Sequence, residues 1–247
     1  MWIRHAVKAI LPTPWVRSVQ QYRARKFTED CSTLSVQQAF AKIYEEGAWG
    51  RSDDPSQPFF SGSGSHDGRV IDAYVDAIQG FLSTFETKPD VVDLGCGDFF
   101  VGSRLRRFCG RYTACDIVPK LVAFDRERYK DLDVDFRVVD LTTDELPAGD
   151  LVFIRQVLQH LSNAQILQAL PAICAKYKYL VLTEHLPGTA AFVHNLDKRV
   201  GPEIRTGSGS GIVLTSPPFN LKAESERTLC NVAEFGGIIR TTLYTLS

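Results

Sequence analysis

From residue 90 onward, short apolar stretches alternate with stretches of helical periodicity. Strands are predicted at 90–94, 111–116, 134–139, 150–155 and 178–183, and helices at 100–108, 119–129 and 162–175. This alternation favours a parallel, doubly wound α/β sheet whose strands are joined by right-handed crossovers. Near the end of the chain, RTLCNVAE and IIRTTLYTL closely flank FGG. Two strand-like segments joined so tightly predict an antiparallel hairpin that closes the sheet.

The residues before this pattern have a different character. Helices are predicted over 33–47 and at about 68–86, and the loop between them is rich in Gly, Ser, Pro and Asp. The loop contains SGSGS at 61–65, and GSGSG recurs at 207–211. Neither segment has room beside it for a second domain, so loops around a site are favoured over linkers.

The chain therefore divides into two parts. Residues 1–86 hold an N-terminal basic segment, helices and a lid loop. Residues 87–247 form the core, with an insertion at about 186–224. The first 28 residues contain basic side chains and no acid before Glu29, which fits an amphipathic segment on an anionic membrane surface or a solvated basic arm.

Charge and cysteine usage limit the function classes. The net charge is −1, so no global basic field attracts nucleic acid, and no nucleic-acid partner is expected. The six cysteines are scattered without metal-ligand spacing, which predicts reduced thiols in a cytoplasmic protein and no metal site. No apolar run approaches the roughly 20 residues that span a bilayer.

The segment VVDLGCGDFF, at 91–100, is the strongest local motif. Gly95 and Gly97 follow a predicted strand and precede a predicted helix, which is the context of a nucleotide-binding turn. Asp116 ends the next strand, close to the spacing of about 20 residues expected for an acid that binds ribose hydroxyls. Asp140 ends the third strand. Acids at neighbouring strand ends line the edge where doubly wound sheets bind ligands.

The end of this loop indicates which nucleotide binds. A third glycine is expected at residue 99 or 100, but the chain has Phe99 there, preceded by Asp98. A dinucleotide pyrophosphate favours a bare helix N-terminus, and the carboxylates of Asp93 and Asp98 would repel it. They would tolerate a cationic, phosphate-free cofactor, so S-adenosylmethionine is favoured over NAD. Two interpretations of Phe99 stay open: a core residue of the first helical turn, or a direct cofactor contact.

At this point the chain resembles the class I S-adenosylmethionine-dependent methyltransferases. The resemblance covers residues 88–185 and rests on DLGCGD, CDIV, VVDL and DLVFIRQVLQHLS. It implies a Rossmann-like, doubly wound, seven-stranded sheet, mostly parallel with a C-terminal antiparallel hairpin. More narrowly, IYEEGAWG, SGSGS, CGDF, RQVLQHLS and SPPFNL resemble small bacterial methyltransferases associated with surface-polysaccharide or glycolipid synthesis.

The resemblance also implies a set of cofactor-binding residues. Gly95 and Gly97 would let the cofactor approach the backbone, Asp93 would organise the loop, Asp116 would hold the ribose, and Asp140 with Leu141 would line the adenine. The full set of cofactor candidates is Trp49, Ser63, Asp93, Gly95, Cys96, Gly97, Asp98, Asp116, Ile117, Asp140, Leu141, Arg155 and Gln156.

The transfer chemistry and the acceptor site rest on fewer signals. His160, just past the fourth strand, is the first candidate base, and Glu184 and His185 are the second candidates; the alternatives are structural roles for His160 and a solvated pair at 184–185. Residues 194–220 are interpreted as acceptor-binding, with Lys198 and Arg205 facing a phosphate or carboxylate, or as a solvated charged loop. Phe219, in SPPFN, completes the candidate substrate-binding residues.

The predicted reaction is O-methylation of a sugar, glycolipid or other small-molecule hydroxyl. The alternatives are N-methylation of a small molecule or protein, and a non-catalytic protein that binds S-adenosylmethionine.

Overall fold

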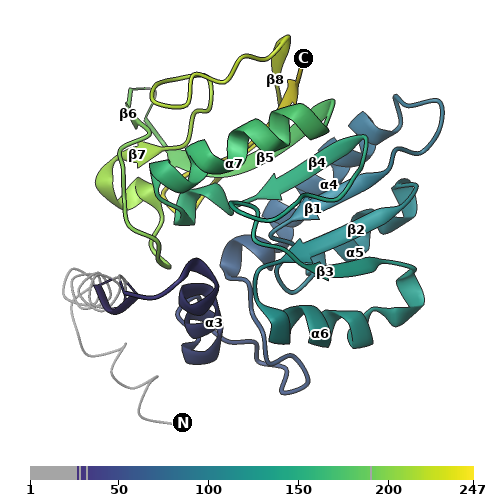
Figure 1. Cartoon of the computed structure of the whole chain (residues 1–247), viewed down its shortest axis with the longest axis horizontal. Helices are drawn as coiled ribbons and strands as arrows, with labels where there is room; N and C mark the ends of the chain where they lie inside the picture. The colour runs from purple at the N-terminus through teal and green to yellow at the C-terminus, as the bar shows by residue number, and fades with distance from the viewer. Residues whose placement is uncertain (1–26, 28, 32, 190) are drawn as a thin grey trace.

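The computed structural model describes residues 27, 29–31, 33–189 and 191–247. The predicted basic segment lies almost entirely outside these residues, so its membrane contact stays a prediction. The chain forms an open twisted sheet with helices on both faces (Figure 1). The helices are α3 (Val36–Glu46), α4 (Gly68–Leu82), α5 (Phe100–Leu105), α6 (Pro119–Arg128) and α7 (Asn163–Lys176).

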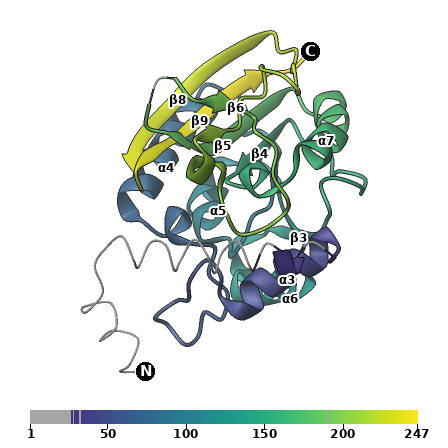
Figure 2. The same cartoon turned by 90° about the vertical axis from the view of Figure 1, so that its left-hand side faces the viewer.

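Seven strands form the main sheet. They are β1 (Val91–Leu94), β2 (Tyr112–Asp116), β3 (Asp135–Val138), β4 (Leu151–Arg155), β5 (Tyr179–Pro187), β8 (Ser225–Glu234) and β9 (Gly237–Thr245). Their order is β3-β2-β1-β4-β5-β9-β8, in which β9 pairs antiparallel with both β5 and β8 and all other pairs are parallel. This confirms the predicted fold class and the C-terminal hairpin. Figure 2 shows that hairpin at the end of the sheet away from β3, α3 and α6.

The connection between β3 and β4 differs from a strict strand–helix alternation. Residues 139–150 connect β3, at the edge of the sheet, to β4 on the far side of β1 through turns, without a helix. The strand order therefore reverses around β1, which lies between β2 and β4. In doubly wound sheets a crevice opens at this reversal, beyond the carboxyl ends of the strands.

The core lies on both faces of the sheet. Alternate residues of β1 point to opposite faces, so Val92 and Leu94 pack with Phe40 of α3 and Ile166 of α7 in one cluster. Val91 packs with α4 residues in the other. Strands buried on both sides are mostly apolar, and β1 departs from this only at Asp93.

A minor two-stranded sheet lies in the predicted insertion. It pairs β6 (Val193–His194) with β7 (Ser210–Gly211) in parallel. Within the described residues, no helix combines the length and the apolar character required to cross a bilayer.

Phe99 belongs to the core. It has φ of 53°, in the left-handed region that usually requires glycine, and it is fully buried. Its ring packs against Tyr112, Tyr129 and Phe136 with centroid distances of 5.0–5.4 Å, and it does not line the pocket described below. The backbone thus keeps the conformation of the missing third glycine, while the side chain fills the core.

Gly102 makes space for the Phe99 ring, which gives a stability prediction. A Cβ at Gly102 would lie 2.3 Å from that ring, so Gly102→Ala should destabilise the fold by about 1–3 kcal/mol through overpacking. Gly80→Ala is the matched control, because Gly80 is also helical and has no atom within 4 Å of such a Cβ. That variant should gain up to about 1 kcal/mol. Urea unfolding measures both, and equal effects would contradict the packing described for Phe99.

Candidate active site

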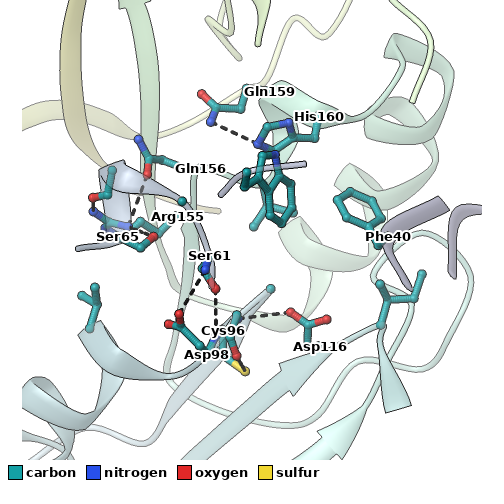
Figure 3. Close-up of a pocket in the computed structure, with 18 of the residues that line it drawn as sticks. Phe40, Ser61, Ser65, Cys96, Asp98, Asp116, Arg155, Gln156, Gln159 and His160 are labelled. Carbon is teal, nitrogen blue, oxygen red and sulfur yellow. Dashed lines mark hydrogen bonds between the residues drawn. The ribbon is translucent and has the colours of Figure 1, made fainter. Parts of the chain in front are cut away.

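A cavity of about 310 Å³ occupies the predicted position at the carboxyl ends of β1, β2 and β4. It is lined by α3, the loop between α3 and α4 (residues 47–67, the lid loop), the glycine loop, the strand ends and the insertion. All thirteen predicted cofactor-binding residues line it, from Trp49 to Gln156. Figure 3 shows Asp98, Cys96 and Asp116 on one side of the cavity, with Gln159 and His160 across from them.

The glycines of the loop are required by close contacts. Gly95 and Gly97 have φ of 79° and 59°, which other residues rarely adopt. A Cβ at Gly95 would lie 2.4 Å from Val157, and one at Gly97 would lie 2.4 Å from the hydroxyl of Ser61. Gly97 thus permits both the turn and the seating of the lid loop.

The acids at the strand ends are held by hydrogen bonds. The Asp116 carboxylate accepts from the backbone N–H of Gly97 at 3.1 Å and of Val118 at 3.0 Å. Tyr112 donates to Asp93 at 2.9 Å, and Thr142 donates twice to Asp140. Burial raises the pKa of Asp93 and of Asp116 to about 6.

Asp98 lines the cavity and also binds the lid loop. Its Oδ2 accepts from the backbone N–H of Ser61 at 3.0 Å and lies 2.7 Å from His66 Nε2. In return, Ser61 Oγ accepts from the backbone N–H of Asp98 at 2.8 Å. The His66 ring is stacked between Phe60 and Phe100. Asp98 therefore fastens the lid loop to the glycine loop.

Trp49 links the lid loop to the insertion. Its Nε1 donates to the carbonyl oxygen of Pro202 at 3.2 Å, and its ring lies 5.0 Å from the His160 ring. Phe40 and Tyr44 of α3 also pack against Trp49. The wall around His160 is therefore aromatic and closed by segments far apart in the sequence.

His160 lines the cavity in a fixed tautomer. Its Nδ1 lies 3.2 Å from the carbonyl oxygen of Gly201, so Nδ1 carries the proton and Nε2 carries the lone pair. The side chain of Gln159 accepts from the backbone N–H of His185, which turns its NH₂ toward His160 Nε2 at 3.4 Å. Burial, and then the charge of Lys198, lower the pKa of His160 to about 3.

This environment predicts that His160 stays neutral throughout the physiological range. The folded pKa lies below the unfolded value, so His160 adds stability as pH rises from about 3 to 6.5, and the whole contribution is present above that range. Histidine NMR between pH 5 and 8 should show the neutral Nδ1–H tautomer for His160 without titration. A midpoint near 6.5 would contradict the burial described here.

Glu184 and His185 have different positions. Glu184 does not line the cavity; its carboxylate accepts from the backbone N–H of Leu158 at 3.1 Å and of Gln159 at 3.0 Å. It thus holds the turn that presents His160, and burial raises its pKa to about 8. His185 lines the cavity, and its Nε2 is buried without a hydrogen-bond partner among the described residues.

The predicted substrate-binding residues do not line the cavity, which corrects that expectation. The Arg205 guanidinium is buried and donates to the carbonyl oxygens of Leu161, at 2.7 Å, and Leu196, so an acceptor anion does not reach it. Lys198 lies 3.4 Å from the carbonyl oxygens of His160 and Gly201. Phe219 is buried in the core. These side chains attach the insertion to the core; Pro202 and Ile204 are the insertion residues at the cavity.

Several cavity residues were not predicted as site residues. Phe40, Tyr44 and Tyr74 come from helices whose apolar spacing indicated only a core face, and Phe235 comes from the hairpin turn. Gln159 precedes His160 in the motif VLQHL, which is the one signal that could have identified it.

The described part of the chain contains neither a metal-binding cluster nor a disulfide. No group of three or more His, Cys, Asp or Glu side chains there is arranged to hold a metal ion. All six cysteines are free thiols.

Comparisons with known proteins agree with this geometry. Residues 91–178 match a family model described as a methyltransferase domain. No curated protein matches the chain significantly. Among solved structures, the N-methyltransferase NodS from Bradyrhizobium japonicum WM9, in complex with S-adenosyl-L-homocysteine, is 14% identical, with 85% of this chain and 98% of that chain covered and a TM-score of 0.59.

Two further structures share the fold. Magnesium protoporphyrin IX methyltransferase from Synechocystis PCC 6803, with bound S-adenosylmethionine, is 15% identical, with 87% of this chain and 98% of that chain covered and a TM-score of 0.55. Human N-acetylserotonin methyltransferase, in complex with S-adenosylmethionine, is 17% identical, with 87% of this chain and 61% of that chain covered and a TM-score of 0.54. At these identities the likeness shows the fold alone.

Residues 91–178 thus match a methyltransferase domain, and the fold is shared with solved methyltransferases that hold S-adenosylmethionine or S-adenosylhomocysteine. This confirms the enzyme class and the cofactor predicted from DLGCGD and the motifs that follow it. The narrower resemblance to methyltransferases of surface-glycan synthesis receives no support from these matches.

Proposed function

We propose that this protein transfers the methyl group of S-adenosylmethionine to a hydroxyl oxygen of a small molecule held beside His160. The observation that carries the proposal is one cavity in which the glycine loop and strand-end acids face a neutral histidine set in an aromatic wall. The proposed acceptor class is a sugar, glycolipid or other small-molecule hydroxyl, as the narrower motif resemblance suggests.

The residues present fit the cofactor. Asp116 and Asp140 are carboxylate acceptors for ribose hydroxyls and the adenine amine, and Asp93 adds negative charge near a sulfonium and an ammonium. The left-handed Gly95 and Gly97 leave the backbone open to close approach. A pyrophosphate cofactor would meet these same acids, which argues against NAD.

The main role of the protein in the reaction is to position the acceptor. S-adenosylmethionine supplies an electrophilic methyl group, and in-line transfer requires the acceptor lone pair to be aligned with it. His160 Nε2 accepts a long hydrogen bond of 3.4 Å from the Gln159 amide, and in this proposal the incoming hydroxyl displaces that amide and is oriented by the same lone pair. Its pKa of about 3 makes it a poor carrier of the hydroxyl proton, so its proposed role is alignment rather than general-base catalysis. The new carbon–oxygen bond forms as the carbon–sulfur bond breaks, which leaves a neutral thioether, and the hydroxyl proton passes to water.

N-methylation is the second candidate, and the same pKa favours it. An uncharged amine attacks without a base, and a neutral His160 would accept a hydrogen bond from its N–H. Phe40, Trp49 and Phe235 would cover the flat face of either kind of acceptor.

A methyl-transfer assay tests the proposal. The full chain is incubated with S-adenosylmethionine labelled in the methyl group and an extract of the organism that makes it, and the labelled product is analysed by mass spectrometry. A labelled small molecule with an O-methyl group is expected, an N-methyl group would select the second candidate, and label only in protein would contradict both.

A further inference from the structure

Arg155 is a cation of the cavity that forms no close ion pair among the described residues, while the charges of Asp93 and Asp98 act on it from farther away. It ends β4 and lines the cavity, and its Nε is buried without a hydrogen-bond partner among the described residues. In that part of the chain, no carboxylate oxygen forms an ion pair with its guanidinium within 4.0 Å. Burial lowers the pKa of Arg155, as expected for a charge removed from water.

The groups that do contact Arg155 are neutral. One terminal nitrogen donates to Ser65 Oγ at 3.0 Å, and the other donates to the carbonyl oxygen of Gly64 at 2.6 Å. The guanidinium also lies over the Tyr74 ring, 5.1 Å from its centroid. These contacts hold the side chain but do not neutralise it. A buried charge without a direct ion-pair partner is poorly compensated, so a counter-ion is expected from a ligand.

The order of the strands indicates which end of the cofactor arrives there. Along the carboxyl edge, Asp140 follows β3, Asp116 ends β2, the glycine loop follows β1, and Arg155 ends β4. Neighbouring strands lie about 4.8 Å apart, so β2 and β4 are separated by roughly 10 Å. A nucleoside held at Asp116 and Asp140 would direct its amino-acid chain across the glycine loop toward Arg155.

The proposed acceptor side of the cavity lies away from Arg155. His160, Gln159 and Phe40 lie away from Arg155, which is grouped with Ser65 and Gln156 (Figure 3). An anion at Arg155 therefore belongs to the cofactor rather than to the acceptor.

We propose that Arg155 binds the α-carboxylate of the cofactor and, through the same guanidinium, couples its binding to closure of the lid loop. This inference rests on the proposed function, since it requires S-adenosylmethionine in the cavity. A carboxylate on the guanidinium fixes the orientation of the fork that donates to Gly64 and Ser65. A ligand that lacks the carboxylate would occupy the nucleoside site without this additional hold on the lid loop.

Calorimetry with two ligands separates these contributions. S-adenosylhomocysteine has the carboxylate, and 5′-methylthioadenosine keeps the nucleoside and sulfur but lacks the amino-acid part. Each is titrated into the full-length wild type, Arg155→Met, Arg155→Lys and the surface control Arg104→Met. Charge-assisted hydrogen bonds contribute about 1.5–3 kcal/mol, so Arg155→Met should weaken S-adenosylhomocysteine binding about 10- to 150-fold. The same variant should change the affinity for 5′-methylthioadenosine less than about threefold, which is no more than the loss of one ordinary hydrogen bond would cause.

The other results have defined meanings. Arg155→Lys should recover part of the S-adenosylhomocysteine affinity, and Arg104→Met should match the wild type. Equal losses for both ligands would overturn the carboxylate assignment and leave Arg155 as a support of the lid loop. Unchanged S-adenosylhomocysteine binding would overturn it in favour of an anionic acceptor. If the wild type binds neither ligand, the proposed function itself fails.

Hydrogen–deuterium exchange tests the coupling in the wild type, independently of whether a variant folds. S-adenosylhomocysteine should slow exchange in the lid loop around residues 61–66 more than saturating 5′-methylthioadenosine does. Equal protection by the two ligands would show that the carboxylate does not act on the lid loop.

Discussion

Asp116→Ala should weaken S-adenosylhomocysteine binding by about a hundredfold or more. The Asp116 carboxylate lies at the cavity and is the proposed acceptor for two ribose hydroxyls. Hydrogen bonds to a charged group contribute about 1.5–3 kcal/mol each, so losing two corresponds to a factor of at least about 10². The same change frees the N–H groups of Gly97 and Val118, which loosens the loop further. Isothermal titration calorimetry measures the affinity.

Asp72→Ala is the control for Asp116→Ala. Asp72 is an exposed aspartate of α4 with a surface ion pair to Arg104, so its removal should leave the affinity unchanged. Circular dichroism must show that Asp116→Ala is folded at the temperature of the titration. A folded Asp116→Ala protein with wild-type affinity would exclude Asp116 from the cofactor site.

Glu184→Ala should lower turnover strongly while cofactor binding stays within a few-fold of the wild type. Glu184 accepts the backbone N–H groups of Leu158 and Gln159, and the change leaves both donors buried without partners. Each costs about 1–3 kcal/mol, so the turn that presents His160 loses about 2–6 kcal/mol of support. Misplacing groups around the reacting atoms by about 1 Å is enough to cost roughly 10²-fold in rate. Turnover with labelled S-adenosylmethionine and calorimetry with S-adenosylhomocysteine are measured on the same preparation.

Glu226→Ala is the matched control for Glu184→Ala, since Glu226 is an exposed glutamate on β8. Its turnover should equal that of the wild type. Normal turnover in Glu184→Ala would show that the turn keeps its shape without the carboxylate. That result would contradict the role of Glu184 in fixing the position of His160.

The fold and the cofactor half of the site were predictable because they depend on local order along the chain. Strand, glycine turn and helix are consecutive at 91–105, and Asp116 follows at the next strand end. Parallel strands bring their carboxyl ends to one edge, so these positions had to meet. Phe99 was the one ambiguity in this stretch, because a left-handed phenylalanine and a third glycine place the chain in the same way.

The acceptor half was not predictable, since it depends on contacts between distant segments. Contacts between distant segments were hidden even at the cofactor site, where Ser61 and His66, more than 30 residues earlier, bind the carboxylate of Asp98. Arg205 has the charge of an anion-binding residue, yet two backbone carbonyl oxygens take up its donors. Residue type alone does not distinguish such buried structural charges from exposed functional ones.

Calorimetry of the full-length protein with S-adenosylhomocysteine and with NAD tests the cofactor site most directly. A cavity with acids at three strand ends and a single arginine should bind S-adenosylhomocysteine and show no measurable heat with NAD. Tight binding of NAD without binding of S-adenosylhomocysteine would contradict the site as described.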